Sequence, residues 1–548
     1  MTPEQLAEAI IAALGQAVSA GDFAVEVPRE VRVERPRSRE HGDWSTNVAL
    51  QLGKQAGMPP RELATRLAAR LESVEGVAAV DVAGPGFLNI TLEAASAGAL
   101  ARSIVEAGPA YGTNETLTGH VINLEFVSAN PTGPLHIGHT RWAALGDAIH
   151  RLLSASGAEV TAEHYTNDAG NQLDLLGASI VARAQGAPLP EGGYPGDYVA
   201  DLADAVLARR PDLLELEEQE QIAVARELGY RTQVAQNEQT LTDFNVHFDV
   251  WFSERTLHDS GAVEQAVERL REQGHVFEQE GAIWLRTTDF GDDRDRVLIR
   301  ANGVPTYFAA DAAYYLSKKD RGFAEKIYLL GADHHGYIGR LKAIAACAGD
   351  DPEVAIEVLI GQLVTIAGAR MGRRRGNALL LTELLQWIGS DPLRYSLARY
   401  PADSPLDLDG EELRKRTNDN PVFYVQYAHA RTCNVARLAR EDGVSRDDGF
   451  DPSLLTHQTE AVLLAGLGDF PRVVAQAATL REPHRVARYL EALSASFHKW
   501  YDECRVRPKD ADEEITDLHR TRLWLNDATR QVLANGLGLL GVNAPERM

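Results

Sequence analysis

Cysteine is scarce in this sequence. Three cysteines occur in 548 residues, and Cys347, Cys433 and Cys504 lie far apart with no Cys-x-x-Cys pair. A disulfide framework needs several cysteines that can pair, and a thiolate zinc site needs them closely spaced. We therefore predict no disulfides and no protein-bound zinc, as is typical of proteins in the reducing cytoplasm.

Positive charge and long apolar runs are scarce as well. Lys and Arg number 55 against 79 Asp and Glu, so the formal net charge is −24. This balance argues against a protein that coats nucleic acid with a basic surface, although local basic patches could still bind it. No apolar run is long enough to cross a bilayer, so we predict no membrane span. The N-terminal stretch 1–14 lacks a basic segment and predicts a capped helix rather than a signal peptide.

The chain divides by pattern into three domains. Residues 1–112 mix helical and strand patterns, which predicts a small α+β domain. Residues 113–400 alternate short β-rich runs with helical segments and predict a parallel sheet, interrupted by an insertion over about 172–280. Residues 401–548 begin with a polar, proline-containing link and then have helical periodicity, which predicts an α-bundle. The predicted fold class is therefore multidomain α/β.

One segment combines a strand, a tight turn and the start of a helix. Residues 121–126 (VINLEF) predict a strand, residues 127–134 contain two prolines and a glycine that end it, and a helical apolar stripe then runs to Ser154. A helix N-terminus presents free N–H groups and favours phosphate. His136 and His139 lie three residues apart beside that end, and Gly138 leaves room for a flat base. We predict a nucleotide site whose donors stabilise charge on a reacting α-phosphate, although an isolated His-x-x-His is more often a capping pair.

This composite motif resembles the nucleotide-binding signature of class I aminoacyl-tRNA synthetases. The string 125–139 (EFVSANPTGPLHIGH) is similar to the arginyl-tRNA synthetase version in particular. The resemblance implies a Rossmann-like catalytic domain with a HIGH motif, in which His136, Gly138 and His139 are catalytic. It also implies that ATP contacts these three residues together with Pro131, Thr132, Gly133 and Asp333.

The same resemblance implies where an arginine side chain would bind. A guanidinium prefers planar carboxylate partners and tolerates stacking on a ring. In residues 296–314 the pattern predicts a strand, an Asn-Gly turn and a helix on which Tyr307 and Asp311 share a face. By their positions in the family's motifs, the residues implied to contact arginine are Glu125, Ser128, Asn130, Tyr307, Asp311 and His334. The alternative is that Asp311 is a surface carboxylate and Tyr307 a core residue.

Two further segments follow predicted strands. Residues 328–337 (YLLGADHHGY) end a β-run in a polar cluster, and ligands bind at such ends. Asp333, His334 and His335 could ligate a metal, but no further His or Cys accompanies them, so we favour a substrate or ribose contact. Where class I synthetases carry the KMSKS loop, this chain is rich in arginine, which can still hold pyrophosphate oxygens. The catalytic positions implied there are Arg370, Met371, Arg373 and Arg374, and the alternative is a solvated basic loop.

Residues that suit tRNA contact occur in both outer domains. Residues 419–431 resemble the family's anticodon-binding helix and mix rings with charge, which suits unpaired bases. The alternative for this helix is an aromatic stripe that packs in the core. In the N-terminal domain, residues 84–89 resemble the segment that touches the tRNA D-loop in this family. The tRNA contacts implied are Phe87, Asn89, Tyr424, Tyr427, His429, Arg431 and Met548.

The resemblance implies an ATP-dependent ligase that activates L-arginine and transfers it to the terminal ribose of tRNA(Arg). Mg²⁺ is expected with ATP as substrate, and the family is usually monomeric and cytoplasmic. We weighed another class I synthetase, an inactive RNA-binding paralogue and a small-molecule nucleotidyltransferase. The acidic pocket argues against another class I synthetase, and the intact HIGH motif argues against an inactive paralogue. The long helical C-terminal region argues against a small-molecule nucleotidyltransferase. The Gly-x-Gly-x-x-Gly string at 536–541 follows a helical segment near the end of the chain, so it predicts no dinucleotide site.

Overall fold

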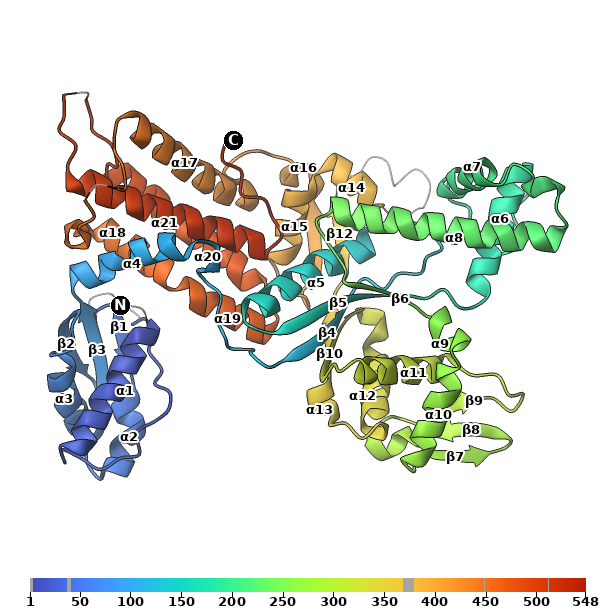
Figure 1. Ribbon diagram of the computed structural model, residues 1–548, viewed down its shortest axis with the longest axis horizontal. Helices are drawn as coiled ribbons and strands as arrows, with labels where there is room; N and C mark the ends of the chain where they lie inside the picture. The colour runs from blue at the N-terminus through green and yellow to red at the C-terminus, as the bar shows by residue number, and fades with distance from the viewer. Residues whose placement is uncertain (1–2, 37–40, 368–378, 448, 511) are drawn as a thin grey trace.

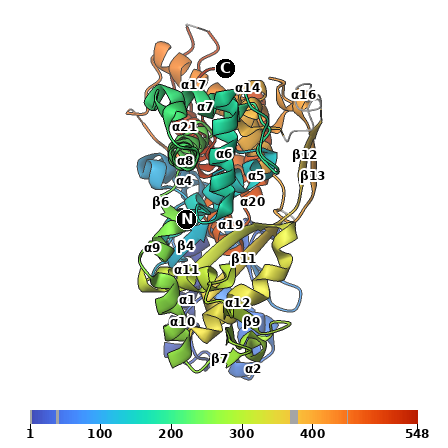
Figure 2. The ribbon, with the colours of Figure 1, turned by 90° about the vertical axis from the view of Figure 1, so that its right-hand side faces the viewer.

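The structure is a computed structural model that describes residues 3–36, 41–367, 379–447, 449–510 and 512–548. The N-terminal domain lies at one end, the C-terminal helices lie above it, and a parallel sheet occupies the middle (Figure 1). Two insertions extend from the sheet at the opposite end. The N-terminal domain and the second insertion both extend below the level of the sheet, far apart along the long axis (Figures 1 and 2).

The N-terminal domain is the predicted α+β unit. Its helices are α1 (Pro3–Ser19), α2 (Val48–Ala56) and α3 (Pro60–Leu71), and its strands are β1 (Trp44–Thr46), β2 (Val77–Ala83) and β3 (Phe87–Leu92). The strands form an antiparallel sheet in the order β1-β3-β2. This domain has a hydrophobic core of its own, separate from the core of the rest of the chain. Helix α4 (Ala94–Ala107) leads from it to the central domain.

The central sheet has five parallel strands. They are β4 (Val121–Glu125), β5 (Glu159–Thr166), β6 (Val250–Ser253), β10 (Glu325–Gly331) and β11 (Ile356–Gly361), in the spatial order β11-β10-β4-β5-β6. The connections that surround them include α5 (Ile137–Ala155), α11 (Tyr307–Asp320), α12 (Ile338–Cys347) and α13 (Pro352–Ala355). The strand order reverses between β4 and β10. Ligands bind at the carboxyl ends of strands at such a switch point.

The region predicted as one insertion is two insertions. The first insertion (residues 167–249) contains α6 (Asn171–Gln185), α7 (Tyr198–Arg209) and α8 (Glu218–Asp243), after which β6 returns to the sheet beside β5. The second insertion (residues 255–305) contains α9 (Arg255–Asp259), α10 (Ala262–Glu272) and the antiparallel strands β7 (Val276–Gln279), β8 (Ala282–Leu285) and β9 (Arg296–Ile299). Strand β6 is only four residues long and all four are half-buried, so it lacks the alternation of a strand with one buried face.

The C-terminal part is helical, as predicted. It contains α14 (Leu381–Trp387), α15 (Ser390–Ala398), α16 (Gly410–Leu413), α17 (Pro421–Glu441), α18 (Gln458–Gly468), α19 (Phe470–Leu480), α20 (His484–Glu503) and α21 (Asp517–Leu539). The link at 401–409 is not wholly irregular, because β13 (Leu406–Asp409) pairs in parallel with β12 (Val364–Ala367). The C-terminal helices share one continuous core with β4, β10 and α5. The central and C-terminal domains therefore pack as a single body.

One apolar stretch of the C-terminal domain has the composition of a membrane helix. Residues 458–480 are long and apolar enough to cross a bilayer, and half of the apolar window lies inside the protein. The stretch comprises two helices, α18 and α19, which meet at Asp469 ahead of a proline at position 471. Leu463, Leu467 and Val474 are fully buried in the shared core. Their burial accounts for the apolar composition.

Candidate functional site at the carboxyl ends of the central strands

The backbone is strained where β4 ends. Val127 has φ 68° and Ser128 has φ 34°, values in the left-handed region that a β-branched residue adopts only at a cost of about 1–3 kcal/mol. The Ser128 hydroxyl donates to Glu125 Oε1 at 3.1 Å and accepts from the backbone N–H of Tyr165 at 3.2 Å. These two bonds tie the start of the turn between β4 and α5 to β4 itself and to the neighbouring strand β5. Strain that is held in this way is typical of functional sites.

The two histidines form the N-terminus of α5. His136 is the N-cap, and its Nδ1 accepts from the Gly138 N–H at 3.1 Å, while His139 Nδ1 accepts from the His136 N–H at 3.2 Å. A Cβ on Gly138 would lie 2.9 Å from the His136 ring, so glycine is needed for this cap. Burial lowers the pKa of His136, and burial together with His136 lowers the pKa of His139 to about 4. Both rings are therefore neutral at pH 7, and because each Nδ1 accepts a hydrogen bond and so carries no proton, each Nε2 carries the ring proton and can donate it.

Acidic side chains gather at the carboxyl ends of the central strands, where Glu125 ends β4 and Glu254 follows β6. Desolvation is the main cause that raises the pKa of Asp311 to about 7, and the carboxylates of Glu254 and Glu125 raise it further, whereas Tyr337 lowers it by donating a hydrogen bond. Desolvation also raises the pKa of Glu254, which accepts from Tyr165 and exposes 3% of its surface. Carboxylates held so close together repel one another until a cation is bound. The pocket is therefore suited to a cationic group.

Glu125 already has a cationic partner in the protein, which sequence reasoning did not predict. Its Oε2 lies 2.5 Å from Nζ of Lys318, which is fully buried and also faces the rings of Tyr314 and Tyr328. On the next strand, Glu163 is fully buried and pairs with Arg321 at 2.6 Å. Glu125 lies in the acidic group, but Lys318 neutralises its charge. The pKa values of Asp311 and Glu254 stay raised despite the nearby Arg340 and His258, so these two carboxylates remain available to a bound cation.

The other predicted arginine contacts surround this group at the surface. Asn130 is exposed in the turn, and Tyr307 is 71% exposed at the first residue of α11, one helical turn before Asp311. The Tyr307 hydroxyl reaches toward Gly170 at the start of α6. Residues 332–337 follow β10 at the same edge of the sheet, but the side chains of Asp333 and His334 lie outside what the structure describes. Arg370, Met371, Arg373 and Arg374 also lie outside the described residues.

The predicted ATP contacts lie in the turn between β4 and α5. Pro131 and Thr132 are buried, and Gly133 is half-buried. Among the residues that the structure describes, no group of three or more His, Cys, Asp or Glu is arranged to hold a metal ion. The turn thus offers backbone groups and the α5 N-terminus to a nucleotide.

Three of the predicted tRNA contacts share one surface of the C-terminal domain. The Arg431 guanidinium donates to the Tyr427 hydroxyl at 2.7 Å and lies over the rings of Tyr427 and Tyr501. Tyr424 and Tyr427 both lie near the ring of His498 on α20. His498 and Tyr501 are far from α17 in sequence, so sequence reasoning missed them. This surface combines rings with a charge, as unpaired bases require.

The remaining predicted tRNA contacts differ in exposure. His429 is 4% exposed and its Nδ1 lies 2.9 Å from the carbonyl of Pro545, so it packs against the C-terminal segment instead of facing solvent. Met548 at the chain end is 58% exposed. In the N-terminal domain Phe87 is 40% exposed, but Asn89 is buried at 6%. His429 and Asn89 therefore do not present their side chains to a macromolecule in this structure.

The chain matches three family models. Residues 4–92 match "Arginyl tRNA synthetase N terminal domain", residues 103–190 and 211–389 match "tRNA synthetases class I (R), catalytic domain", and residues 425–548 match "DALR anticodon binding domain". The chain is 65% identical over 555 residues to the arginine–tRNA ligase of Pseudarthrobacter chlorophenolicus and 66% identical over 551 residues to that of Renibacterium salmoninarum. Both alignments cover 100% of each chain.

Solved structures show the same architecture. The arginyl-tRNA synthetase of Thermus thermophilus superimposes with a TM-score of 0.76 at 26% identity and covers 100% of both chains. A protein from Campylobacter jejuni titled an arginyl-tRNA synthetase gives 0.75 at 33% identity and covers 83% of this chain and 100% of its own. A methionyl-tRNA synthetase from Mycobacterium tuberculosis gives 0.55 at 14% identity over 77% of this chain and 91% of its own, which reflects the fold alone.

Proposed function

The chain belongs to the arginyl-tRNA synthetase family, and we propose that the pocket between α5, β4 and α11 is where it activates arginine with ATP. The protein is an arginine–tRNA ligase. It binds arginine and ATP in the central domain and tRNA(Arg) through the C-terminal domain. The observation that carries the site is the pair of desolvated carboxylates, Asp311 and Glu254, whose pKa values are raised at the carboxyl ends of the central strands.

The proposed first step joins the arginine carboxylate to the α-phosphate of ATP and releases pyrophosphate. Asp311 and Glu254 hold the cationic groups of arginine, and Tyr307 lines the entrance. The Nε2 donors of His136 and His139, together with the α5 N-terminus, hold oxygens of the α-phosphate as negative charge develops there. Mg²⁺ enters bound to the ATP phosphates. The step needs positioning and charge stabilisation, and no protein group forms a covalent bond.

In the second step the acyl group moves to the terminal ribose of tRNA(Arg), and AMP leaves. We propose that Tyr424, Tyr427 and Arg431 contact the anticodon side of the tRNA and that Phe87 contacts its D-loop side. We also propose that the enzyme acts as a monomer in the cytoplasm, which velocity sedimentation and cell fractionation would test. Arg370, Met371, Arg373 and Arg374 are proposed to hold pyrophosphate, as the KMSKS loop does in the family.

The direct test of this function is aminoacylation of total tRNA with each amino acid in turn. Arginine alone should be charged, and the product should form only with ATP present. Charging with another amino acid, or with none, would contradict the proposal. Size-selected tRNA from the same preparation, treated with periodate to destroy the terminal ribose, is the matched control and should accept nothing.

We expect arginine activation to depend on tRNA. Members of this family usually activate arginine only with tRNA bound, and the C-terminal domain of this chain shares its core with the HIGH-bearing helix α5. Contacts in the C-terminal domain can therefore influence the position of α5. Arginine-dependent exchange of pyrophosphate into ATP should be at background without tRNA and should appear when tRNA(Arg) is added. Full exchange in the absence of tRNA would show that this chain departs from the family.

The affinity for arginine should depend on pH through Asp311. The pKa of Asp311 is about 7 in the unliganded protein, so the carboxyl is protonated below that pH and cannot pair with a cation. The value of kcat/KM for arginine should therefore fall by up to about tenfold per pH unit below pH 7. His139 does not contribute to this limb, because its pKa of about 4 keeps it neutral there. Steady-state arginylation between pH 5.5 and 8.5 measures the profile, and a flat profile would exclude the role of Asp311.

A further inference from the structure

The first insertion makes hydrogen bonds to the turn between β4 and α5, where the ATP contacts are predicted. The Tyr198 hydroxyl on α7 donates to the backbone carbonyl of Thr132 at 2.8 Å, and the Asn237 amide on α8 donates to the carbonyl of Gly133 at 3.2 Å. The Gln233 amide donates to Asn237 Oδ1 at 3.0 Å, which fixes the Asn237 side chain with its NH₂ group toward the turn. Two consecutive carbonyls of the turn are thus bound by two different helices of the insertion.

The first insertion is in turn anchored to the sheet. Asp168, 2% exposed at the end of β5, accepts from the Tyr230 hydroxyl on α8 and from the Ser253 hydroxyl on β6, both at 2.6 Å. Arg255 pairs with Glu227 on α8 at 2.9 Å and donates to the Asp168 carbonyl at 2.8 Å. Helix α8 is therefore held in place relative to the strand ends. The bonds from Tyr198 and Asn237 come from a fixed support.

The bond from Tyr198 orients the next peptide N–H. The Thr132–Gly133 peptide is trans, so its carbonyl and its N–H point in opposite directions. Because the carbonyl points at Tyr198, the Gly133 N–H points away from the first insertion. Among the residues that the structure describes, no acceptor bonds to the Gly133 N–H. A free N–H in the turn that precedes the histidine-capped helix is a donor for an anion.

We propose that Tyr198, supported by Asn237, is a positioning residue that turns the Gly133 N–H toward a phosphate of bound ATP. This inference rests on the proposed use of the turn for ATP and adds the residues that set its conformation. Tyr198 itself touches no substrate. Glycine at 133 is part of the same arrangement, because a Cβ there would lie 3.2 Å from the Tyr198 hydroxyl oxygen and push the tyrosine away.

The test compares ATP with adenosine in the variant Tyr198→Phe. Loss of the hydroxyl frees the Thr132 carbonyl, and the Gly133 N–H then no longer points at the phosphate. The dissociation constant of ATP, measured by titration calorimetry, should therefore rise by about tenfold, as expected for loss of one hydrogen bond to a charged group. The dissociation constant of adenosine, which lacks phosphates, should change by less than about twofold. Tyr194→Phe, in the loop just before α7, is the matched control and should leave both constants unchanged. Asn237→Ala should show the same selectivity with a smaller rise.

A double variant distinguishes a positioning role of Tyr198 from a nonspecific disturbance of the turn. In the parent protein, Gly133→Ala should lower the affinity for ATP, because the new methyl group contacts the hydroxyl of Tyr198. In the Tyr198→Phe background that hydroxyl is gone, the nearest ring carbon is 3.4 Å from the new Cβ, and the added loss of ATP affinity should be small. The inference would be overturned if Tyr198→Phe lowered the affinities for ATP and adenosine equally. It would also be overturned if the losses of ATP affinity were additive in the double variant. Failure of the parent enzyme to charge tRNA with arginine would instead overturn the proposed function, because the comparison of ATP with adenosine needs only binding.

Discussion

Asp311→Asn is expected to lose most of its arginine activation while its affinity for ATP stays close to that of the parent. Asp311 is one of two desolvated carboxylates at the site whose pKa is raised although a positive or protonatable group (Arg340 for Asp311, His258 for Glu254) lies near, and the amide cannot replace its charge. Removing one partner of a buried charge pair costs about 2–5 kcal/mol, which corresponds to a fall of about 30-fold to several thousand-fold in kcat/KM for arginine. The measurement is arginylation at pH 8 over a range of arginine concentrations.

The same variant should be at least as resistant to unfolding as the parent at pH 8. The pKa of Asp311 is raised from 3.8 to about 7, so between these values the folded state binds more protons than the unfolded state, and stability falls as the pH rises through this window. Above pH 7 the desolvated carboxylate destabilises the empty pocket, and asparagine removes that charge. A loss of activity without a loss of unfolding temperature would identify Asp311 as a residue retained for substrate.

Asp320→Asn is the matched control for this experiment. Asp320 ends the same helix α11, is largely exposed and pairs with Arg269 at 2.7 Å on the surface. A surface pair of this kind contributes about 0–1 kcal/mol, so both activity and stability should stay near the parent values. Unchanged arginine kinetics in Asp311→Asn, or an equal fall in Asp320→Asn, would exclude a direct contact between Asp311 and arginine.

Local features of the site could be predicted from the sequence. The strand, the proline-glycine turn and the helix that follows them are encoded by residues close together in the chain, and the structure has them where predicted. The cap formed by His136 and His139 is the alternative interpretation of that pair. The helix that carries Tyr307 and Asp311 was predicted for the same reason. The strained Val127 and Ser128 were not predicted, because neither residue type favours positive φ and the strain is held by Tyr165 on another strand.

Features that depend on distant segments could not be predicted. Glu254 joins Asp311 only because β6 pairs with β5, and Lys318 reaches Glu125 only because α11 packs across β4 and β10. Helical periodicity places His429 and Arg431 on α17, but it does not reveal that the C-terminal segment covers His429. Residue pairs distant in sequence therefore decided which polar groups are neutralised, buried or exposed.

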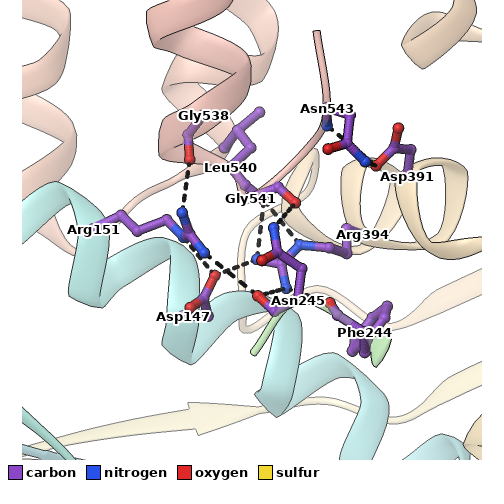
Figure 3. A network of polar contacts seen from close by, with 10 residues as sticks. All are labelled: Asp147, Arg151, Phe244, Asn245, Asp391, Arg394, Gly538, Leu540, Gly541 and Asn543. Carbon is purple, nitrogen blue, oxygen red and sulfur yellow. Dashed lines mark hydrogen bonds and ion pairs between the residues drawn. The ribbon is translucent and has the colours of Figure 1, made fainter. Parts of the chain in front are cut away.

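Arg394→Met is expected to destabilise the junction of the central and C-terminal domains strongly. Figure 3 shows Arg394 on α15, fully buried, with its guanidinium paired with Asp147 of α5. The guanidinium also donates to the Phe244 carbonyl at 2.8 Å, to the Asn245 carbonyl at 3.0 Å and to the Leu540 carbonyl at 3.1 Å. One side chain thus joins α5, the end of the first insertion's last helix and the C-terminal segment. The fork of five N–H donors is needed for so many acceptors.

The expected loss of stability follows from what methionine leaves behind. Asp147 would keep only Arg151, a partly exposed partner at 2.7 Å. The buried carbonyls of Phe244 and Leu540 and the half-buried carbonyl of Asn245 would each lose a donor. Breaking a buried ion pair from one side costs about 3–5 kcal/mol. Arg394→Lys keeps the charge but lacks the fork, so it should also be destabilised. Gly541→Ala should act from the other side, because Gly541 has φ 65° and a Cβ there would lie 2.1 Å from the Arg394 guanidinium.

Urea unfolding with hydrogen exchange would measure this loss and locate it. Exchange should accelerate first at residues 540–543 and at the end of α8, whereas the N-terminal domain, which has a separate core, should unfold as in the parent. Arg151→Met is the matched control, because it removes the exposed partner of the same Asp147 and should cost about 1 kcal/mol or less. If Arg394→Met unfolded at the same urea concentration as Arg151→Met, the buried pair would not hold the domains together. Because α5 carries both Asp147 and the capping His136, arginylation should fall at the same urea concentrations at which this junction opens.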